Sequence, residues 1–589
     1  MSSRQVPSAI TNGETITERE EHSGHRQFIS EPQLFLLLAI IIGIISGLAV
    51  VCFQVAIDWL RILLLGPALI PHWPRIVIAP VAVGVVVAIM VLKLFPRVRG
   101  SGVNQTKAAL YIYNGRIPFS TVIGKFITCS LAIGSGQSLG PEDPSLQIGA
   151  GIASAIGRAL HLSRDRVRLI APVGAAAGLA AAFNAPITAV LFVIEEVIGG
   201  WRVGVLGAVV LSAVSSSVVE RWFMGGEPLF RIPSFQLVNP GELVAYAILG
   251  VAGGIASLIF IKLIAGLRPI FRGLPRWTQY LQPATAGLII AIIGLRFPQV
   301  MGAGYEFMDH AMHDQYTWQI LGMLAGMKIL STTLSFVSGT PGGMFAPTLF
   351  IGAMLGGAVG GVEHIFFPHL TGSVGAYALV GMGTMFAGFL RAPMTSVFMI
   401  LEVSGNYSII LPVIISNTIA YLISHSLQPT PIFDLLSQQD GLDLPSMEQQ
   451  RERRILRVED AMRPALAPVL RCSDSVSDAI QKAESSNETI FLVADDLAGW
   501  HEVTKQELRE WAAGDKASAP LRTVVHVSRL PRLHPDQALD YALREIGDLP
   551  LVPVVHRADF ARLEGVISLA DILAAYRRAG KATGDGSVE

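Results

Sequence analysis

A run of residues without one charged side chain, Gln33–Ile57, stands near the start of this chain of 589 residues. Such a run is typical of a helix that crosses a lipid bilayer, because a helix satisfies its own backbone hydrogen bonds there. The whole chain agrees with this, since 51% of its residues are hydrophobic and only 15% are charged. The run has no small-residue cleavage site, so we interpret it as a first membrane-spanning helix and not as a signal peptide.

Further apolar segments follow as far as about His425, but many of them are short. Three of them, Ser145–Ile156, Ala185–Ile194 and Met394–Leu401, fall short of the ~20 residues that one crossing requires. Short segments broken by glycine and proline predict tilted or half-crossing helices around a buried site. Arginines cluster in one connection, which predicts that this loop is cytoplasmic, and we expect the N-terminal tail on the same side.

The sequence changes character at Ser437, after which charged residues are frequent and apolar runs are brief. Two stretches of this part each combine a short extended piece, an amphipathic helix and a β-type run, which predicts two tandem α/β modules. The expected domains are a cytoplasmic tail at 1–30, a transmembrane domain at 31–436, the two modules within 437–580 (about 458–512 and 523–578) and a flexible tail at 581–589.

The membrane part contains an internal repeat. GPEDPSLQIGA (Gly140–Ala150) matches GMFAPTLFIGA (Gly343–Ala353), and FNAPITAVLFVIEE (Phe183–Glu196) matches LRAPMTSVFMILEV (Leu390–Val403), in the same order and at nearly the same separation. Transporters built from two related halves bind their substrate between the halves, at broken helices whose N-terminal N–H groups face the ligand. Proline near a helix start leaves such groups free, so the pattern predicts an anion site.

These motifs resemble those of the CLC family of chloride channels and proton-coupled chloride transporters. GSGVN (Gly100–Asn104), GPEDP (Gly140–Pro144) and GMFAP (Gly343–Pro347) are similar to the family's anion-binding signatures GSGxP, G(K/R)EGP and GxFxP. The resemblance covers about residues 30–435, and the soluble part resembles the paired CBS modules of many members. It implies an all-α polytopic membrane domain with two inverted-topology repeats of tilted and broken helices, followed by a cytoplasmic α/β CBS-domain pair.

The resemblance also assigns roles to residues. The Ser101 hydroxyl and the backbone N–H groups of Met344 and Phe345 would bind the central chloride. Glu142 would be the gate, its carboxylate competing with chloride until it is protonated, and Glu196 would be the inner proton acceptor. Dipoles without a positive side chain suit this task, because they stabilise an anion without trapping it.

Three of these assignments have plainer alternatives. Ser101 is also what a turn between two glycines would contain. The Phe345 ring is expected to be core packing, so its proposed role rests on its backbone. Glu196 follows Glu195 and could belong to a solvated helix end. For Glu142 no plain alternative is strong, because carboxylates at membrane depth usually line a pathway.

The sequence departs from the family pattern at four positions. Pro141 replaces the usual basic residue before the gate, and Asp143 replaces the usual glycine after it, so we expect Asp143 to modulate the gate. A second carboxylate and burial both favour protonated Glu142, which predicts opening at a higher pH than in relatives with the usual motif. Asn104 stands in place of the signature proline, and Phe433 stands where many members have a tyrosine whose hydroxyl contacts chloride.

We therefore predict chloride transport, as exchange for protons, because acids are retained at both Glu142 and Glu196. A passive voltage- or pH-gated chloride channel is the alternative. The histidines form no HExxH motif, and GSGQS has no partner histidine in its segment, so we expect neither an enzyme nor a metal site. A net charge of −1 gives no reason to expect nucleic acid as a partner. The resemblance implies a homodimer with one pathway per subunit, in the lipid bilayer of a bacterial inner membrane.

The soluble modules contain two pairs of a hydroxyl and a carboxylate, Ser568 with Asp571 and Thr504 with Glu507. In related modules such carboxylates hold the ribose of an adenine nucleotide, so weak nucleotide binding is expected here. The same spacing is equally typical of helix N-caps. No other cofactor is expected.

Overall fold

The structure is a computed structural model that describes residues 31–67, 73–200, 203–226, 240–367, 372–442, 444, 456–495, 499–525 and 530–582. The chain forms two compact units, Met1–Arg451 and Glu452–Glu589, and each is described by itself. The boundary predicted at 436/437 lies within a helix of the first unit, α17 (Ile432–Gln439). The predicted tail at 1–30, and the predicted tail at 581–589 beyond residue 582, lie outside the described residues.

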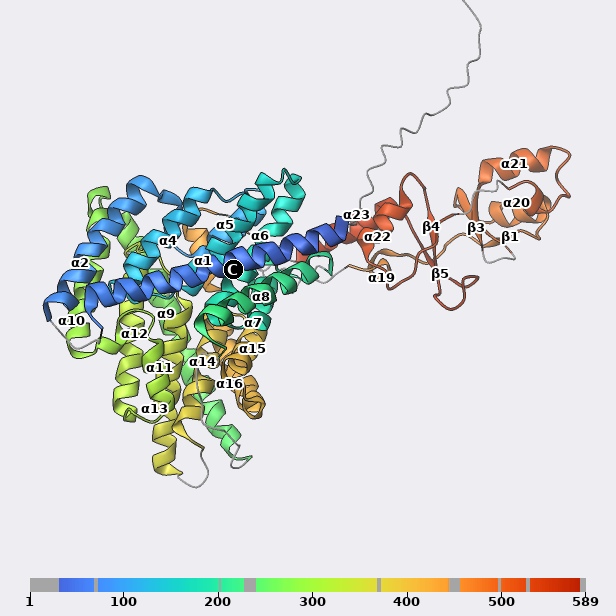
Figure 1. Cartoon of the computed structure of the whole chain (residues 1–589). Coiled ribbons are helices and arrows are strands. Elements are labelled where there is room, and N and C mark those ends of the chain that lie inside the picture. The colour runs from blue at the N-terminus through green and yellow to red at the C-terminus, as the bar shows by residue number, and fades with distance from the viewer. Residues whose placement is uncertain are drawn as a thin grey trace, which may run out of the picture. The chain divides into compact units, whose positions relative to one another are not determined.

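The first unit is helical (Figure 1). Its helices are α1 (Glu31–Leu65), α2 (Trp73–Ile89), α3 (Gly102–Tyr111), α4 (Phe119–Gly134), α5 (Glu142–Ala159), α6 (Arg164–Phe183), α7 (Pro186–Phe192), α8 (Val203–Met224), α9 (Glu242–Gly273), α10 (Gln282–Arg296), α11 (Tyr305–Met312), α12 (Trp318–Val337), α13 (Phe345–Phe366), α14 (Val374–Leu390), α15 (Pro393–Ser404), α16 (Ile410–Leu427) and α17 (Ile432–Gln439).

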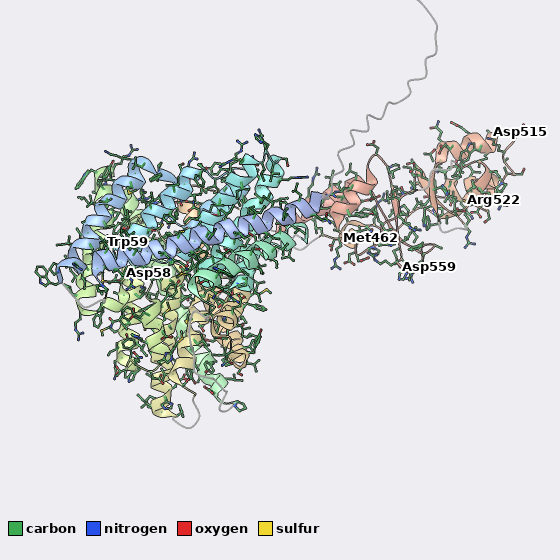
Figure 2. All side chains as sticks on the ribbon, in the orientation of Figure 1. Asp58, Trp59, Met462, Asp515, Arg522 and Asp559 are labelled. Atoms are coloured by element: carbon green, nitrogen blue, oxygen red, sulfur yellow. The ribbon has the colours of Figure 1, made fainter. Side chains whose placement is uncertain are left out.

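Eight helices among the described residues are long and apolar enough to cross a membrane. Helix α1 contains the predicted first span. Many of its large apolar side chains are exposed, among them Trp59 at 62% (Figure 2). An apolar surface of this kind is stable in contact with lipid and unfavourable in contact with water. Other helices are short: α7 has 7 residues and continues as a π-helical segment, η3 (Val193–Ile198), and α15 has 12. The predicted mixture of long and short helices is therefore present.

The repeat in the sequence is a repeat in the structure. Helix α5 packs along α6, and α13 packs along α14. Glycine allows the backbones to touch in both pairs: a Cβ on Gly149 would lie 2.1 Å from the carbonyl oxygen of Gly174, and one on Gly352 would lie 2.3 Å from that of Gly381. Close backbone contact of this kind is a common way for membrane helices to associate.

The ends of α6 and α14 also correspond. Each helix ends at a residue in the left-handed conformation, Asn184 at φ 51° and Arg391 at φ 61°. Each of these residues precedes an Ala-Pro pair that starts the next helix, α7 or α15. Proline suits the first turn because its missing N–H would have no intrahelical partner there.

The two halves meet at Gly140 and Gly343. These residues form an isolated antiparallel bridge in which the N–H of each donates to the carbonyl oxygen of the other, with both N···O distances 2.8 Å. They come shortly before α5 and α13, so the bridge places the N-termini of these two helices beside one another.

The second unit contains two small α/β modules. Their elements are α19 (Val458–Ala461), β1 (Leu470–Arg471), α20 (Val476–Glu484), β2 (Ile490–Ala494), β3 (Trp500–Thr504), α21 (Lys505–Ala513), α22 (Leu539–Ile546), β4 (Val552–Val555), β5 (Leu563–Ile567) and α23 (Leu569–Ala582). In the first module β1 pairs parallel with β2, which pairs antiparallel with β3. The second module repeats this order, with a parallel bridge from Leu533 to Val554 and antiparallel pairing of β4 with β5. The residues of α19 pack in the core of the second module.

Candidate functional site

Glu142 is completely buried at the start of α5. Its Oε2 accepts a hydrogen bond from the backbone N–H of Ala346, in the first turn of α13, at an N···O distance of 3.2 Å. Its other carboxylate oxygen, Oε1, has no hydrogen-bond partner among the described residues. Leaving a buried carboxylate oxygen unpaired is costly. The Glu142 side chain is therefore held weakly, at a helix N-terminus that would suit an anion equally well.

Asp143 is also completely buried, but its carboxylate is bound elsewhere. Its Oδ2 accepts from the Ser101 hydroxyl at 3.0 Å, and its Oδ1 accepts from the backbone N–H of Val103 at 2.9 Å. Ser101 is the N-cap of α3 and Val103 lies in its first turn. The hydroxyl predicted to bind chloride thus donates to a carboxylate of the protein itself.

A buried lysine on α4 lies close to this second acid. The Lys125 ammonium donates to the carbonyl oxygens of Val98 at 3.0 Å and Gly100 at 2.8 Å. It also attracts the Asp143 carboxylate electrostatically. The motif usually has a basic residue where this chain has Pro141. Lys125, on α4, partly replaces that missing positive charge.

A second buried lysine, Lys328 on α12, attracts Glu142 as Lys125 attracts Asp143. Its ammonium donates to the carbonyl oxygens of Val300 at 3.1 Å and Gly302 at 2.7 Å, and it attracts the Glu142 carboxylate. Sequence reasoning missed both lysines. The signal was available, because Lys125 and Lys328 are offset along the chain by the same number of residues as Gly140 and Gly343.

The Phe345 ring lies in an aromatic cluster at the start of α13. Its centroid is 5.0 Å from that of Phe192, 5.6 Å from Phe386, 6.1 Å from Phe183 and 6.3 Å from Phe433. These contacts fix the position of the first turn of α13, in which backbone N–H groups have no intrahelical partner. The ring of Phe433 thus lies near the predicted chloride ligands, although it carries no hydroxyl.

Helix α3 holds α17 through two side chains. Asn104, which replaces the signature proline, donates from Nδ2 to the carbonyl oxygen of Phe433 at 2.8 Å. One turn further along, Lys107 donates to Asp434 Oδ1 at 3.1 Å. The change from proline to asparagine therefore has a structural consequence, which is to fix Phe433 against α3.

Lys107 also donates to Glu196 Oε1 at 2.9 Å, so one ammonium joins two carboxylates. The side chains of Lys107, Glu196 and Asp434 are 0%, 4% and 7% exposed. Buried charges of this kind are stable only when they are paired, because each loses its hydration. Glu196 was predicted to accept protons, and sequence reasoning missed the lysine that binds it.

Glu195 has a different environment from its neighbour. Its Oε2 accepts from the backbone N–H of Thr395 at 2.9 Å and from the Thr395 hydroxyl at 2.6 Å, in the first turn of α15. Glu402, its equivalent in the repeat, accepts in the same way from Ile187 and Thr188 in α7. The two glutamates are reciprocal helix caps, and their alignment in the repeated motif was the signal for this.

A cavity of about 730 Å³ reaches the N-terminus of α3. Ser101, Asn104 and Gln147 lie at its wall. Five arginines also line it: Arg97, Arg99, Arg116, Arg158 and Arg164. Among the described residues of the lining, Asp440 is the one acid. Positive charge concentrated in a cavity raises the local concentration of anions, and Ser101 lies in the wall of this cavity.

In the second unit, the predicted nucleotide ligands form helix caps. Ser568 and Asp571 bind one another at the start of α23, and Asp571 Oδ2 also accepts from Arg463 Nε at 3.2 Å. Thr504 and Glu507 form a capping box at the start of α21.

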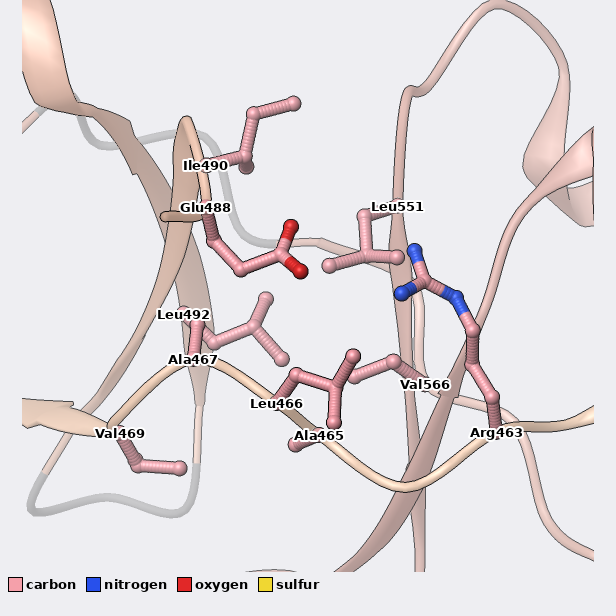
Figure 3. Close-up of a pocket in the computed structure, with 10 residues that line it drawn as sticks. All are labelled: Arg463, Ala465, Leu466, Ala467, Val469, Glu488, Ile490, Leu492, Leu551 and Val566. Atoms are coloured by element: carbon pink, nitrogen blue, oxygen red, sulfur yellow. The ribbon is translucent and has the colours of Figure 1, made fainter. Parts of the chain in front are cut away.

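A cavity of about 20 Å³ lies between the two modules, with Arg463 and Glu488 on opposite sides of it (Figure 3). This is room for about one water molecule. Within the described residues, no group of three or more His, Cys, Asp or Glu is placed to hold a metal ion.

The fold and the site define a membrane transport protein for anions. Two helical halves meet at broken helices, buried carboxylates lie at helix N-termini, and arginines line a cavity. The sequence over residues 83–425 matches the family described as voltage gated chloride channel, and the chain belongs to this family.

Curated relatives match about two thirds of the chain. A protein of Ralstonia nicotianae described as putative chloride channel protein ClcB-like is 32% identical over 406 residues, which are 66% of this chain and 94% of that protein. The H(+)/Cl(-) exchange transporter ClcA of Vibrio campbellii is 31% identical over 430 residues, which are 70% of this chain and 91% of the relative.

Solved structures have the same fold. A slow cyanobacterial Cl−/H+ antiporter matches with a TM-score of 0.64 and 26% identity, over 69% of this chain and 97% of its own. A eukaryotic CLC transporter matches with a TM-score of 0.61 and 21% identity, over 92% of this chain and 99% of its own. At this identity the second match bears on the fold alone.

Proposed function

We propose that the protein exchanges chloride for protons across a membrane, with Glu142 as the gate. The observation that carries this is the position of the Glu142 carboxylate, buried at the N-terminus of α13 with one oxygen bound to Ala346 and the other unpaired. Chloride and a carboxylate compete for the same N–H groups at such a place. Protonation removes the charge that holds the side chain there, so proton binding and chloride entry are linked. The names of the bacterial relatives support exchange.

The antiparallel bridge between Gly140 and Gly343 and the reciprocal caps Glu195 and Glu402 support two inverted-topology repeats. A two-fold axis between the halves would exchange each of these residues with its partner. The substrate path would then pass between the halves, where α5 and α13 begin.

Glu196 remains the proposed inner proton acceptor, and Lys107 becomes part of that site. A proton that reaches Glu196 has to weaken a buried ion pair, so transfer through this site would be slow. The same ion pair is the one observation that favours the second candidate, a passive chloride channel, in which Glu196 would only be structural.

Flux in vesicles tests the proposal. Purified protein reconstituted with an inward chloride gradient is expected to move protons against their own gradient. Chloride movement without proton movement would support the channel. Absence of both would contradict anion transport.

For the second unit we propose a cytoplasmic CBS pair, in a homodimer of the bacterial inner membrane. The repeated order of strands and helices in the two modules supports the CBS assignment. An adenine nucleotide would compete with Arg463 and Ser568, which already donate to Asp571 Oδ2. Calorimetry of the whole purified protein with ATP and AMP tests this, and no heat with either would remove the proposed ligand.

A further inference from the structure

We propose that Asp143 is a tethered anion, which occupies an anion-binding place at the N-terminus of α3 and must leave it before a transported anion can bind there. The proposal rests on the proposed anion transport and adds a second carboxylate to it. Glu142 would close the path at α13, and Asp143 would close it at α3. The two residues are consecutive, yet they bind to different helices.

The donors around Asp143 are those that suit a small anion. The Ser101 hydroxyl lies 3.2 Å from Oδ1 and 3.0 Å from Oδ2, and the Val103 N–H lies 2.9 Å from Oδ1. A hydroxyl combined with a first-turn N–H group is a common donor set for phosphate, sulfate or halide at a helix start. These donors are 4% exposed or less, so an anion that replaced Asp143 would be fully enclosed.

The backbone holds Asp143 close to this place. A Cβ on Gly102 would lie 2.3 Å from the Asp143 carbonyl oxygen, so the first turn of α5 rests directly on the first turn of α3. Little backbone movement is possible there. The carboxylate has to leave, if it leaves, by rotation of its own short side chain.

An independent feature points to an anion at the same donors. The cavity lined by five arginines reaches Ser101, and Asp143 itself is not part of its wall. Anions drawn into this cavity therefore arrive at a hydroxyl that is already occupied. The protein concentrates anions at a place that its own carboxylate blocks, which is the arrangement of a competitive gate.

Lys125 makes the exchange electrostatically balanced. Its ammonium is bound to the carbonyl oxygens of Val98 and Gly100, and it attracts Asp143 without a hydrogen bond to it among those described. An anion that takes the place of the carboxylate would receive the same attraction. The buried positive charge would thus remain compensated in both states.

Chloride binding to the purified full-length protein tests the proposal. We expect Asp143→Asn, which keeps the shape but not the charge, and Asp143→Ala, which empties the place, to bind chloride about tenfold more tightly or better, because a charged competitor is removed. Asp143→Glu is the matched control and should keep the weaker affinity. Equal chloride affinity in the wild type, Asp143→Asn and Asp143→Ala would overturn the proposal.

A second measurement does not depend on how well these variants fold. Infrared difference spectra on adding chloride to Glu142→Gln protein should show a carboxylate band that moves, because Asp143 loses its hydrogen bonds. The gate residue cannot produce that band in this background. No moving carboxylate band would contradict the proposal.

These experiments are separate from the test of exchange. They measure anion binding, whereas exchange is measured as proton movement in vesicles. A protein that moves chloride without protons would refute the proposed exchange and leave the role of Asp143 open to confirmation by binding.

Discussion

The ammonium of Lys107 lies 2.9 Å from Oε1 of Glu196, and both side chains are buried. The same ammonium lies 3.1 Å from Asp434 on α17. One cation therefore fixes the residue proposed to accept protons to two other helices of the first unit. Proton uptake by Glu196 therefore depends on its ion pair with Lys107.

The first prediction is that Glu196→Gln abolishes chloride-driven proton movement and spares chloride flux, because glutamine keeps the shape but cannot carry a proton. Glu195→Gln is the matched control, since Glu195 caps α15 and has no proposed proton role. Parallel chloride and proton recordings from vesicles measure both. Proton movement that survives in Glu196→Gln, or that disappears equally in the control, would assign the inner role elsewhere.

The second prediction is that Lys107→Met destabilises the protein by about 3–5 kcal/mol, because two buried carboxylates lose their counter-charge. Lys262→Met on the exposed face of α9 provides the control, with little expected effect. Thermal unfolding in detergent measures the difference. Similar unfolding midpoints for both variants would show that Glu196 and Asp434 do not depend on Lys107.

The third prediction concerns Ser101 and Phe433. In an Asp143→Asn background, Ser101→Ala should weaken chloride binding by about 1.5–3 kcal/mol, the usual contribution of a hydrogen bond to a charged group. In the wild type the loss should be smaller, since the hydroxyl binds Asp143 when chloride is absent. Phe433→Tyr should tighten binding by adding a hydroxyl near α13. Calorimetric titration with chloride measures all three, and unchanged affinities throughout would mean that the chloride site is misplaced.

Sequence motifs predicted the framework of this site and its carboxylates, but not the lysines that compensate their charge. The repeated segments that begin at Gly140 and Gly343 indicated that two helix starts meet, and they do. Lys107, in contrast, is 89 residues from Glu196 and 327 from Asp434 along the chain. Such pairing depends on tertiary packing, which no local pattern encodes. Single lysines also hardly alter the average hydropathy of a segment, so they were not recognised as buried.

The same reasoning applies to Asp143. Its sequence position next to Glu142 indicated that the two carboxylates repel one another. The direction of its side chain, toward Ser101 on α3, follows from how α5 begins and could be known only from the fold.

The fourth prediction is that Asp143→Gly shifts the activation of chloride flux to lower pH. The negative charge of Asp143 favours the protonated, open form of Glu142, so its removal means that more acid is needed to open the gate. The other charged or titratable groups that act on the two carboxylates are Lys125 and Cys129 at Asp143 and Lys328 at Glu142. They are present in both proteins, so the shift reports the loss of the Asp143 charge. Flux measured from acidic to neutral pH tests this. An unchanged profile would mean that Asp143 does not affect the charge of the gate.

The fifth prediction tests the central claim, that protonation of Glu142 opens the path for chloride. Glu142→Gln imitates the protonated side chain and cannot compete for the N–H of Ala346 as an anion. The measurement is simultaneous recording of chloride and proton movement in vesicles, with wild-type and Glu142→Gln protein, across acidic to neutral pH. The account predicts pH-dependent, proton-coupled chloride movement in the wild type and pH-independent, uncoupled chloride movement in the variant. A variant whose chloride flux keeps the wild-type pH profile and still moves protons would contradict it.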